Sequence, residues 1–181
     1  AATDAAFGVI TAYADAPETA VTPTLNDYVV AGAQGVTTAN LAALNSALAS
    51  SSIAAAQVNT LSELQTLVDA YNRILAEANG TANDLTVADP TAAQYAAIGA
   101  NIGLAAQSTA QGANALALLN DSLGAQVMTA VDSVTEIDAL ASTVTGIMTT
   151  AAGSAANPAL TAEALTSLGL SCMTDGNLAT V

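Results

Sequence analysis

The sequence predicts an all-α protein, built as tandem three-helix bundles that are joined by short linkers and flanked by partial units at both ends. Composition is the first reason: 52% of the 181 residues are hydrophobic, whereas 3% are aromatic and 9% are charged. The apolar share comes largely from alanine, which favours helix but buries little surface, so we expect slim helices around a thin core. The other two reasons are evenly spaced prolines and repeated helix-start motifs.

Three prolines recur along the chain at intervals of 67 and 68 residues. They are Pro23, Pro90 and Pro158. Each follows a residue that can cap a helix, respectively Thr22, Asp89 and Asn157. Proline loses no useful N–H at the first helical position, and glycine is a common C-terminal stop. We therefore expect first helices that begin at these prolines and close near glycine, over about residues 23–35, 90–103 and 158–169.

The second helix of each unit is expected where residues 40–48 match 114–123, because both segments contain a Leu-Asn pair. The second unit carries a longer link before this helix, around residues 107–112. Tyr28 and Tyr95 occupy matching places in the two first helices. The match therefore extends through the first two helices of both units.

Third helices are expected at Thr60 and Ser133, which Glu63 and Glu136 follow three positions later. This spacing is a capping box, in which hydroxyl and carboxylate satisfy each other's backbone N–H groups. Apolar residues then recur at helical spacing. They are Leu61, Leu64, Leu67, Val68, Tyr71, Ile74 and Leu75 in one segment, and Val134, Ile137, Leu140, Ala141, Val144 and Ile147 in the other.

These motifs divide the chain into four segments. They are the third helix of a preceding partial unit (1–22), two complete units (23–89 and 90–157), and a first helix with the start of a second (158–181). Residues 9–13 resemble 67–71 in a third helix, and residues 177–181 resemble the start of a second helix. We expect either a window on a longer repetitive chain or neighbouring molecules that complete each other's broken unit.

Charge excludes several classes of function. The net charge is −14, and Arg73 is the only basic residue. Phosphate binding depends on Lys and Arg, so nucleic acids and anionic membrane surfaces are not expected partners. Uncharged stretches at 28–62 and 90–120 contain many Asn, Gln, Ser, Thr and Gly residues, so we expect no membrane insertion. The single cysteine, Cys172, allows a buried thiol or an intermolecular bridge.

Catalysis is not expected, because the chain has no histidine and no lysine to serve as a general base or metal ligand. We assign no catalytic, cofactor-binding or metal residue and expect no cofactor. Asp84 and Asp89, with Asn83 adjacent, could offer oxygen ligands to calcium, but their spacing matches no EF-hand. A cap explains Asp89 more simply, as the capping boxes explain Glu63 and Glu136.

Two smaller features have competing interpretations. The tyrosines could stack against sugars, although their helical spacing favours the core. They are Tyr13, Tyr28, Tyr71 and Tyr95. Arg73 is expected to pair with Asp69 or Glu77, each four residues away.

Residues 35–48, 58–75 and 89–95 resemble the GA-like three-helix repeats of giant bacterial surface proteins and adhesins. The resemblance covers nearly the whole chain, but its motifs are helix caps and apolar stripes, which identify architecture better than activity. It implies a self-assembling extracellular structural segment (filament, sheath, surface layer, adhesin stalk or biofilm component) whose partners are adjacent repeats or further copies. The alternative is a module that binds a host protein or glycan. Albumin-binding members usually carry lysine, so we assign albumin binding to no residue here.

Overall fold

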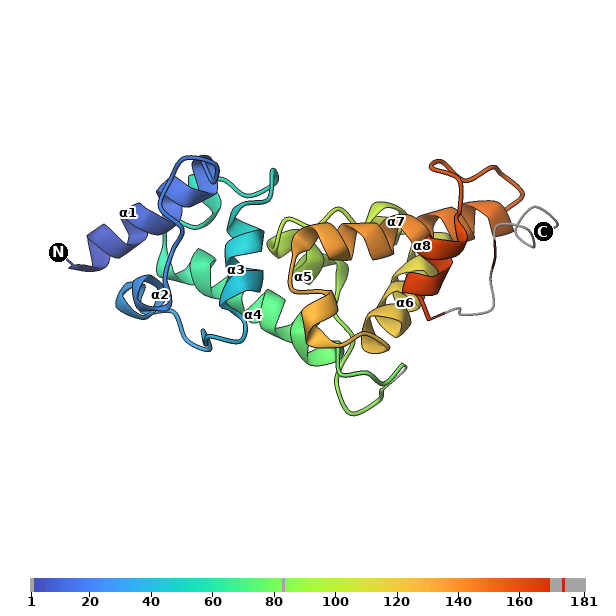
Figure 1. Ribbon diagram of the computed structural model, residues 1–181, viewed down its shortest axis with the longest axis horizontal. Coiled ribbons are helices and arrows are strands. Elements are labelled where there is room, and N and C mark those ends of the chain that lie inside the picture. The colour runs from blue at the N-terminus through green and yellow to red at the C-terminus, as the bar shows by residue number, and fades with distance from the viewer. Residues whose placement is uncertain (1, 83, 170–173, 175–181) are drawn as a thin grey trace.

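The computed structural model describes residues 2–82, 84–169 and 174, and over these residues the predicted all-α class is confirmed (Figure 1). The described residues form eight α-helices and three short 3₁₀ helices, with no strand. They are α1 (Ala2–Asp15), α2 (Leu25–Ala31), α3 (Leu41–Leu48), η1 (Ala55–Gln57), α4 (Leu61–Glu77), α5 (Ala92–Ala97), η2 (Gly103–Ala106), α6 (Ala110–Gly124), η3 (Met128–Ala130), α7 (Val134–Ala151) and α8 (Ala162–Ser167). Figure 1 shows an elongated molecule, with α1 at one end and α8 towards the other. No helix in this part of the chain is long and apolar enough to cross a bilayer.

The first helices begin later than the prolines predict. Helices α2, α5 and α8 are capped by Thr24, Thr91 and Thr161, so the expected caps at Thr22, Asp89 and Asn157 are wrong. The threonines cap these helices because their hydroxyls form hydrogen bonds within the first turn. For example, Thr91 Oγ accepts from the N–H of Gln94 at 3.3 Å. Proline therefore precedes the cap rather than opening the helix.

The first helices also end earlier than expected in two of three cases. Helix α2 stops at Gly32, with φ of 95°, and α5 ends just before Gly99, with φ of 77°. Only glycine adopts this left-handed conformation without strain, so these residues terminate the helices before Gly35 and Gly103. Helix α8 ends near Gly169, as predicted.

The third helices begin as predicted. The N–H of Thr60 donates to the Glu63 carboxylate at 3.0 Å, and the N–H of Ser133 donates to Glu136 at the same distance. The second helix α6 begins earlier than expected, because Thr109 accepts from the N–H of Gly112 at 3.0 Å and caps it. The predicted link at 107–112 is therefore shortened to a few residues.

One hydrogen-bonded arrangement occurs twice. The Tyr28 hydroxyl donates to Asn45 Oδ1 at 2.8 Å, and Asn45 Nδ2 donates to the carbonyl of Pro23 at 2.9 Å. In the second unit, Tyr95 donates to Asn120 at 2.8 Å, and Asn120 donates to the carbonyl of Pro90 at 3.0 Å. Each set fixes a first helix and its preceding proline to the following second helix. We call it the Tyr–Asn–Pro clasp.

Each third helix also packs against the elements that follow it. Helix α1 contacts α2, α3 and η1, while α4 contacts α3 behind it and both α5 and α6 ahead of it. The Tyr71 hydroxyl of α4 donates to the carbonyl of Val131, beyond η3, at 3.3 Å. The buried core consequently runs as one cluster from Ala6 in α1 to Val144 in α7.

At the C-terminal end, α8 contacts α7, as α5 contacts α4. The expected start of a second helix at 177–181 and Cys172 lie outside the described residues.

The two clasps differ in burial, which gives a testable difference in stability. Asn120 is 3% exposed, whereas Asn45 is partly open to solvent. Tyr95→Phe leaves a buried amide oxygen unpaired and should destabilise the protein by about 1–3 kcal/mol. Tyr28→Phe should have a smaller effect, because water can reach Asn45. Urea unfolding followed by circular dichroism measures both, and an equal or larger effect of Tyr28→Phe would contradict the comparison.

Candidate functional site

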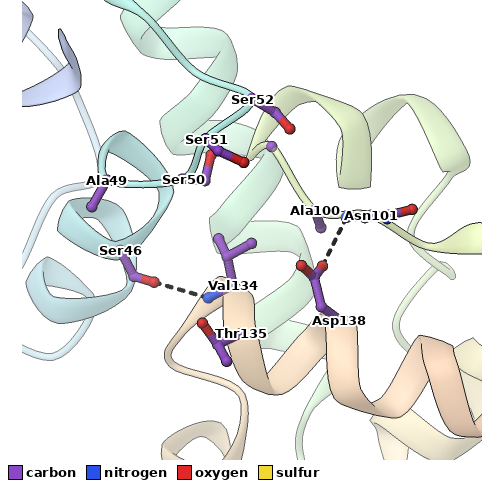
Figure 2. A pocket seen from close by; sticks show the side chains of 11 residues that line it. Ser46, Ala49, Ser50, Ser51, Ser52, Ala100, Asn101, Val134, Thr135 and Asp138 are labelled. Carbon is purple, nitrogen blue, oxygen red and sulfur yellow. Dashed lines mark hydrogen bonds between the residues drawn. The ribbon is translucent and has the colours of Figure 1, made fainter. Parts of the chain in front are cut away.

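A polar cleft of about 600 Å³ lies between the end of α3, the turn that follows α5 and the start of α7 (Figure 2). We call it the serine cleft. Its wall includes a run of three consecutive serines, and the far side carries the side chains of α7. The side chains with polar groups that line it are Ser46, Ser50, Ser51, Ser52, Asn101, Thr135 and Asp138.

Two hydrogen bonds hold the walls of the serine cleft together, and both are drawn in Figure 2. Ser46 Oγ on α3 accepts from the N–H of Val134, the first residue of α7, at 2.9 Å. This satisfies one of the backbone donors that a helix start leaves free. The carboxylate of Asp138 accepts from the N–H of Asn101 at 2.7 Å, which ties α7 to the turn after α5. The cleft is therefore a junction between the two predicted units.

Asp138 is the only acidic residue that lines the serine cleft. Burial raises its pKa above the ordinary value, while the hydrogen bond from Asn101 acts in the opposite direction. Hydroxyls and one carboxylate can hydrogen-bond a neutral polar ligand. Across the described ranges there is no group of three or more His, Cys, Asp or Glu side chains able to hold a metal ion.

Gly99 brings the turn after α5 unusually close to the end of α3. Its φ of 77° is left-handed, and a Cβ added there would overlap Ser50 Oγ and lie 3.0 Å from the side chain of Ile53. Ser50 Oγ is itself buried, with no hydrogen-bond partner among the described residues. Only glycine at this position allows the two walls to approach so closely.

The residues that the sequence singled out do not meet at this cleft. Tyr28, Tyr71 and Tyr95 are fully buried, so their rings belong to the core and cannot stack on an external sugar. Burial raises the pKa of the three hydroxyls above the ordinary value of 10, so these groups remain protonated donors. Tyr13 is partly buried against the same core.

The loop between α4 and α5, which contains the calcium-ligand candidates Asp84 and Asp89, is ordered by internal hydrogen bonds. The carboxylate of Asp84 accepts from the N–H of Thr86 at 2.8 Å, from its hydroxyl at 2.7 Å and from Asn79 Nδ2 at 2.9 Å. The bonds from Thr86 lower the pKa of Asp84. Asn83 lies outside the described residues. Arg73 donates to the carbonyl of Ala88 at 3.4 Å, so the pairing expected with Asp69 or Glu77 is not the one formed.

The sequence indicates Glu77 only as a possible partner of Arg73 and does not predict its burial. Glu77 lies at the end of α4, is 1% exposed, and its Oε2 has no hydrogen-bond partner. Burial raises its pKa; the carboxylates of Asp89 and Asp84 act in the same direction, and Arg73 opposes them. The helical spacing could have indicated this burial, because Glu77 follows the buried Ile74 by three positions and so lies on the apolar face of α4.

No known family matches the chain, and no curated protein and no solved structure gave a significant match. The class of the protein therefore rests on its fold alone. Over the described residues it is an all-α protein, and its helices are arranged along an elongated molecule (Figure 1).

Gly99 offers a test of how tightly the serine cleft is closed. Gly99→Ala adds left-handed strain of about 1–2 kcal/mol and an overlap with Ser50 that should cost about 1–3 kcal/mol more. Gly153 is a matched control, because its φ is 80° but nothing lies within 4 Å of an added Cβ. Gly153→Ala should therefore show the strain alone in chemical unfolding.

Ser50→Gly in the Gly99→Ala background should recover part of the lost stability, since it removes the overlapping hydroxyl. Equal destabilisation by Gly99→Ala and Gly153→Ala would show that the two walls do not approach as closely as described.

Proposed function

We propose that this chain is a non-catalytic structural repeat segment of an extracellular bacterial surface protein, such as a filament, sheath, surface layer or adhesin stalk. In this proposal, residues 23–89 and 90–157 are two three-helix units joined by short linkers. Residues 1–22 end a preceding unit, and residues 158–181 begin a further one.

The repeated Tyr–Asn–Pro clasp is the observation that supports this proposal most strongly. Its hydrogen bonds join the same three residue types, in corresponding places, at Tyr28 and at Tyr95. The recurrence of the same three-partner arrangement, buried in one copy and partly buried in the other, favours duplication of a unit over coincidence.

The packing of the third helices supports an assembly role. Helix α4 contacts elements on both sides of it, so neighbouring units share a helix instead of meeting through loops alone. A bundle of about 60 residues is marginally stable by itself, and alanine-rich cores bury little surface per residue. Stacked neighbours supply the missing burial, as in repeat proteins whose stability comes from nearest-neighbour interfaces.

The serine cleft favours a second candidate, a binding module for a host protein or glycan. Its hydroxyls and the carboxylate of Asp138 are suited to a neutral polar ligand, although no aromatic ring lines the cleft. Recovery of no serum protein in a pull-down, together with no binding on a glycan array, would rule this candidate out.

If neighbouring molecules complete each other's broken unit, and the unit does not instead continue along a longer chain, the structural proposal predicts that the chain associates end to end. Sedimentation velocity at rising concentration should show species heavier than the 17.6 kDa monomer, and negative-stain microscopy should show linear particles. A chain that remains monomeric at high concentration would rule out completion of the unit between molecules.

A pair of variants makes this test specific to α1. Ala5 on α1 and Ala42 on α3 are both exposed helical alanines. Ala5→Arg should weaken association by adding a bulky charge to the outer face of α1, whereas Ala42→Arg should leave it unchanged. Equal effects of the two variants would place the contact elsewhere.

A further inference from the structure

Glu77 occupies a tightly closed position where α4 meets α6. A Cβ added to Gly124 of α6 would lie 3.0 Å from Glu77 Oε1 and 2.9 Å from the carbonyl oxygen of Thr81. The carboxyl group, the backbone of the loop after α4 and the end of α6 therefore converge on one point. Glu77 is 1% exposed there, so water cannot solvate a negative charge on it unless these elements separate.

The charged groups that act on Glu77 come from every element around it and are mostly negative. Asp84 and Asp89 lie in the loop between α4 and α5, and Asp121 belongs to α6. Arg73, on α4 itself, is the only cation of the chain and donates to the carbonyl of Ala88. Tyr95 of α5 is the remaining titratable neighbour, and its hydroxyl stays protonated.

Two backbone contacts show what a separation would break. The N–H of Gly80 donates to the carbonyl of Gln126 at 2.8 Å, and Asn79 forms an isolated antiparallel bridge with Val127. Both contacts follow Glu77 within three residues and join the loop after α4 to the segment after α6. We call this pair of contacts the α4–α6 junction.

We propose that Glu77 is a proton-sensitive lock on the α4–α6 junction. With its proton, the side chain is neutral and fits the closed site. Without its proton, an unpaired negative charge faces three carboxylates, and the junction opens to let water reach it. The α4–α6 junction, which connects the two predicted units, is therefore more stable at acid pH than at neutral or alkaline pH.

The direction follows from linkage. The folded state raises the pKa of Glu77 above its ordinary value of 4.5. The closed form therefore binds the proton more tightly than the open or unfolded form. This contribution to stability is fully present below pH 4.5 and is lost as the pH rises through the raised pKa. The equilibrium constant for opening should increase up to tenfold for each pH unit within that window.

Amide hydrogen exchange at Gly80 and thermal unfolding test the proposal. Comparing Glu77→Gln with the unmodified chain at each pH cancels the intrinsic pH dependence of exchange. As the pH rises above 4.5, exchange at Gly80 should accelerate more in the unmodified chain than in Glu77→Gln, and the unfolding midpoint of the unmodified chain should fall further. The slope that remains in Glu77→Gln reports the other carboxyl groups, such as Asp138. Glu18→Gln, at an exposed position, is the matched control and should behave like the unmodified chain. Identical pH profiles for Glu77→Gln and the unmodified chain would overturn the proposal.

A measurement on the unmodified chain is decisive even if Glu77→Gln does not fold. The chain has five glutamates, so carbon-detected NMR can follow each side-chain carboxyl through a pH titration. A midpoint for Glu77 above 4.5 supports the lock, and a midpoint at or below 4.5 overturns it. Repeating the unfolding measurements with calcium chloride tests whether the carboxylates bind a cation instead. A calcium-dependent rise in stability that disappears in Glu77→Gln would assign them to cation binding and overturn the lock.

Discussion

The fold depends on how two of its short helices, α2 and α5, are held in place. Helices α2 and α5 contain seven and six residues, far fewer than an isolated helix needs in water. The Tyr–Asn–Pro clasp stabilises these short helices. One asparagine amide accepts a hydrogen bond from a tyrosine on the short helix and donates one to the carbonyl of the proline that precedes the helix. The middle of the short helix and the proline before it are thereby fixed to the following helix, and each short helix ends near a glycine in the left-handed conformation, Gly32 or Gly99.

The third helices then determine the overall shape. Helix α4 is 17 residues long and buries a continuous apolar stripe, so it can contact α3, α5 and α6 at once. Because α4 and α7 each contact elements before and after them, the core continues from one part of the chain to the next and does not close into separate globules. An alanine-rich sequence gains from this arrangement, since each small side chain buries little area and stability requires many shared contacts.

The sequence was sufficient to predict the helical class and the third helices, because capping boxes and apolar periodicity are local signals. The sequence placed the starts of the first helices too early. Two candidate caps lie close together at each start, the residue before the proline and a threonine shortly after it. Only the structure shows that Thr24, Thr91 and Thr161 are the caps. The serine cleft was not predictable, since Ser46 and Val134 are 88 residues apart. The burial of Glu77 was not predicted, because an isolated glutamate at a helix end ordinarily faces solvent.

The two third helices differ at one equivalent position, and this difference gives their junctions different chemistry. Glu77 and Thr150 both lie 17 residues after their capping residues, Thr60 and Ser133, yet Glu77 is buried and Thr150 is exposed. Among the described residues, the one buried carboxyl group therefore lies where α4 meets α6. Helices α4 and α7 have nearly the same length and the same kind of cap, but only α4 carries a buried carboxyl group. Sensitivity to pH is accordingly expected at the centre of the molecule, where separation of α4 from α6 would divide the continuous core.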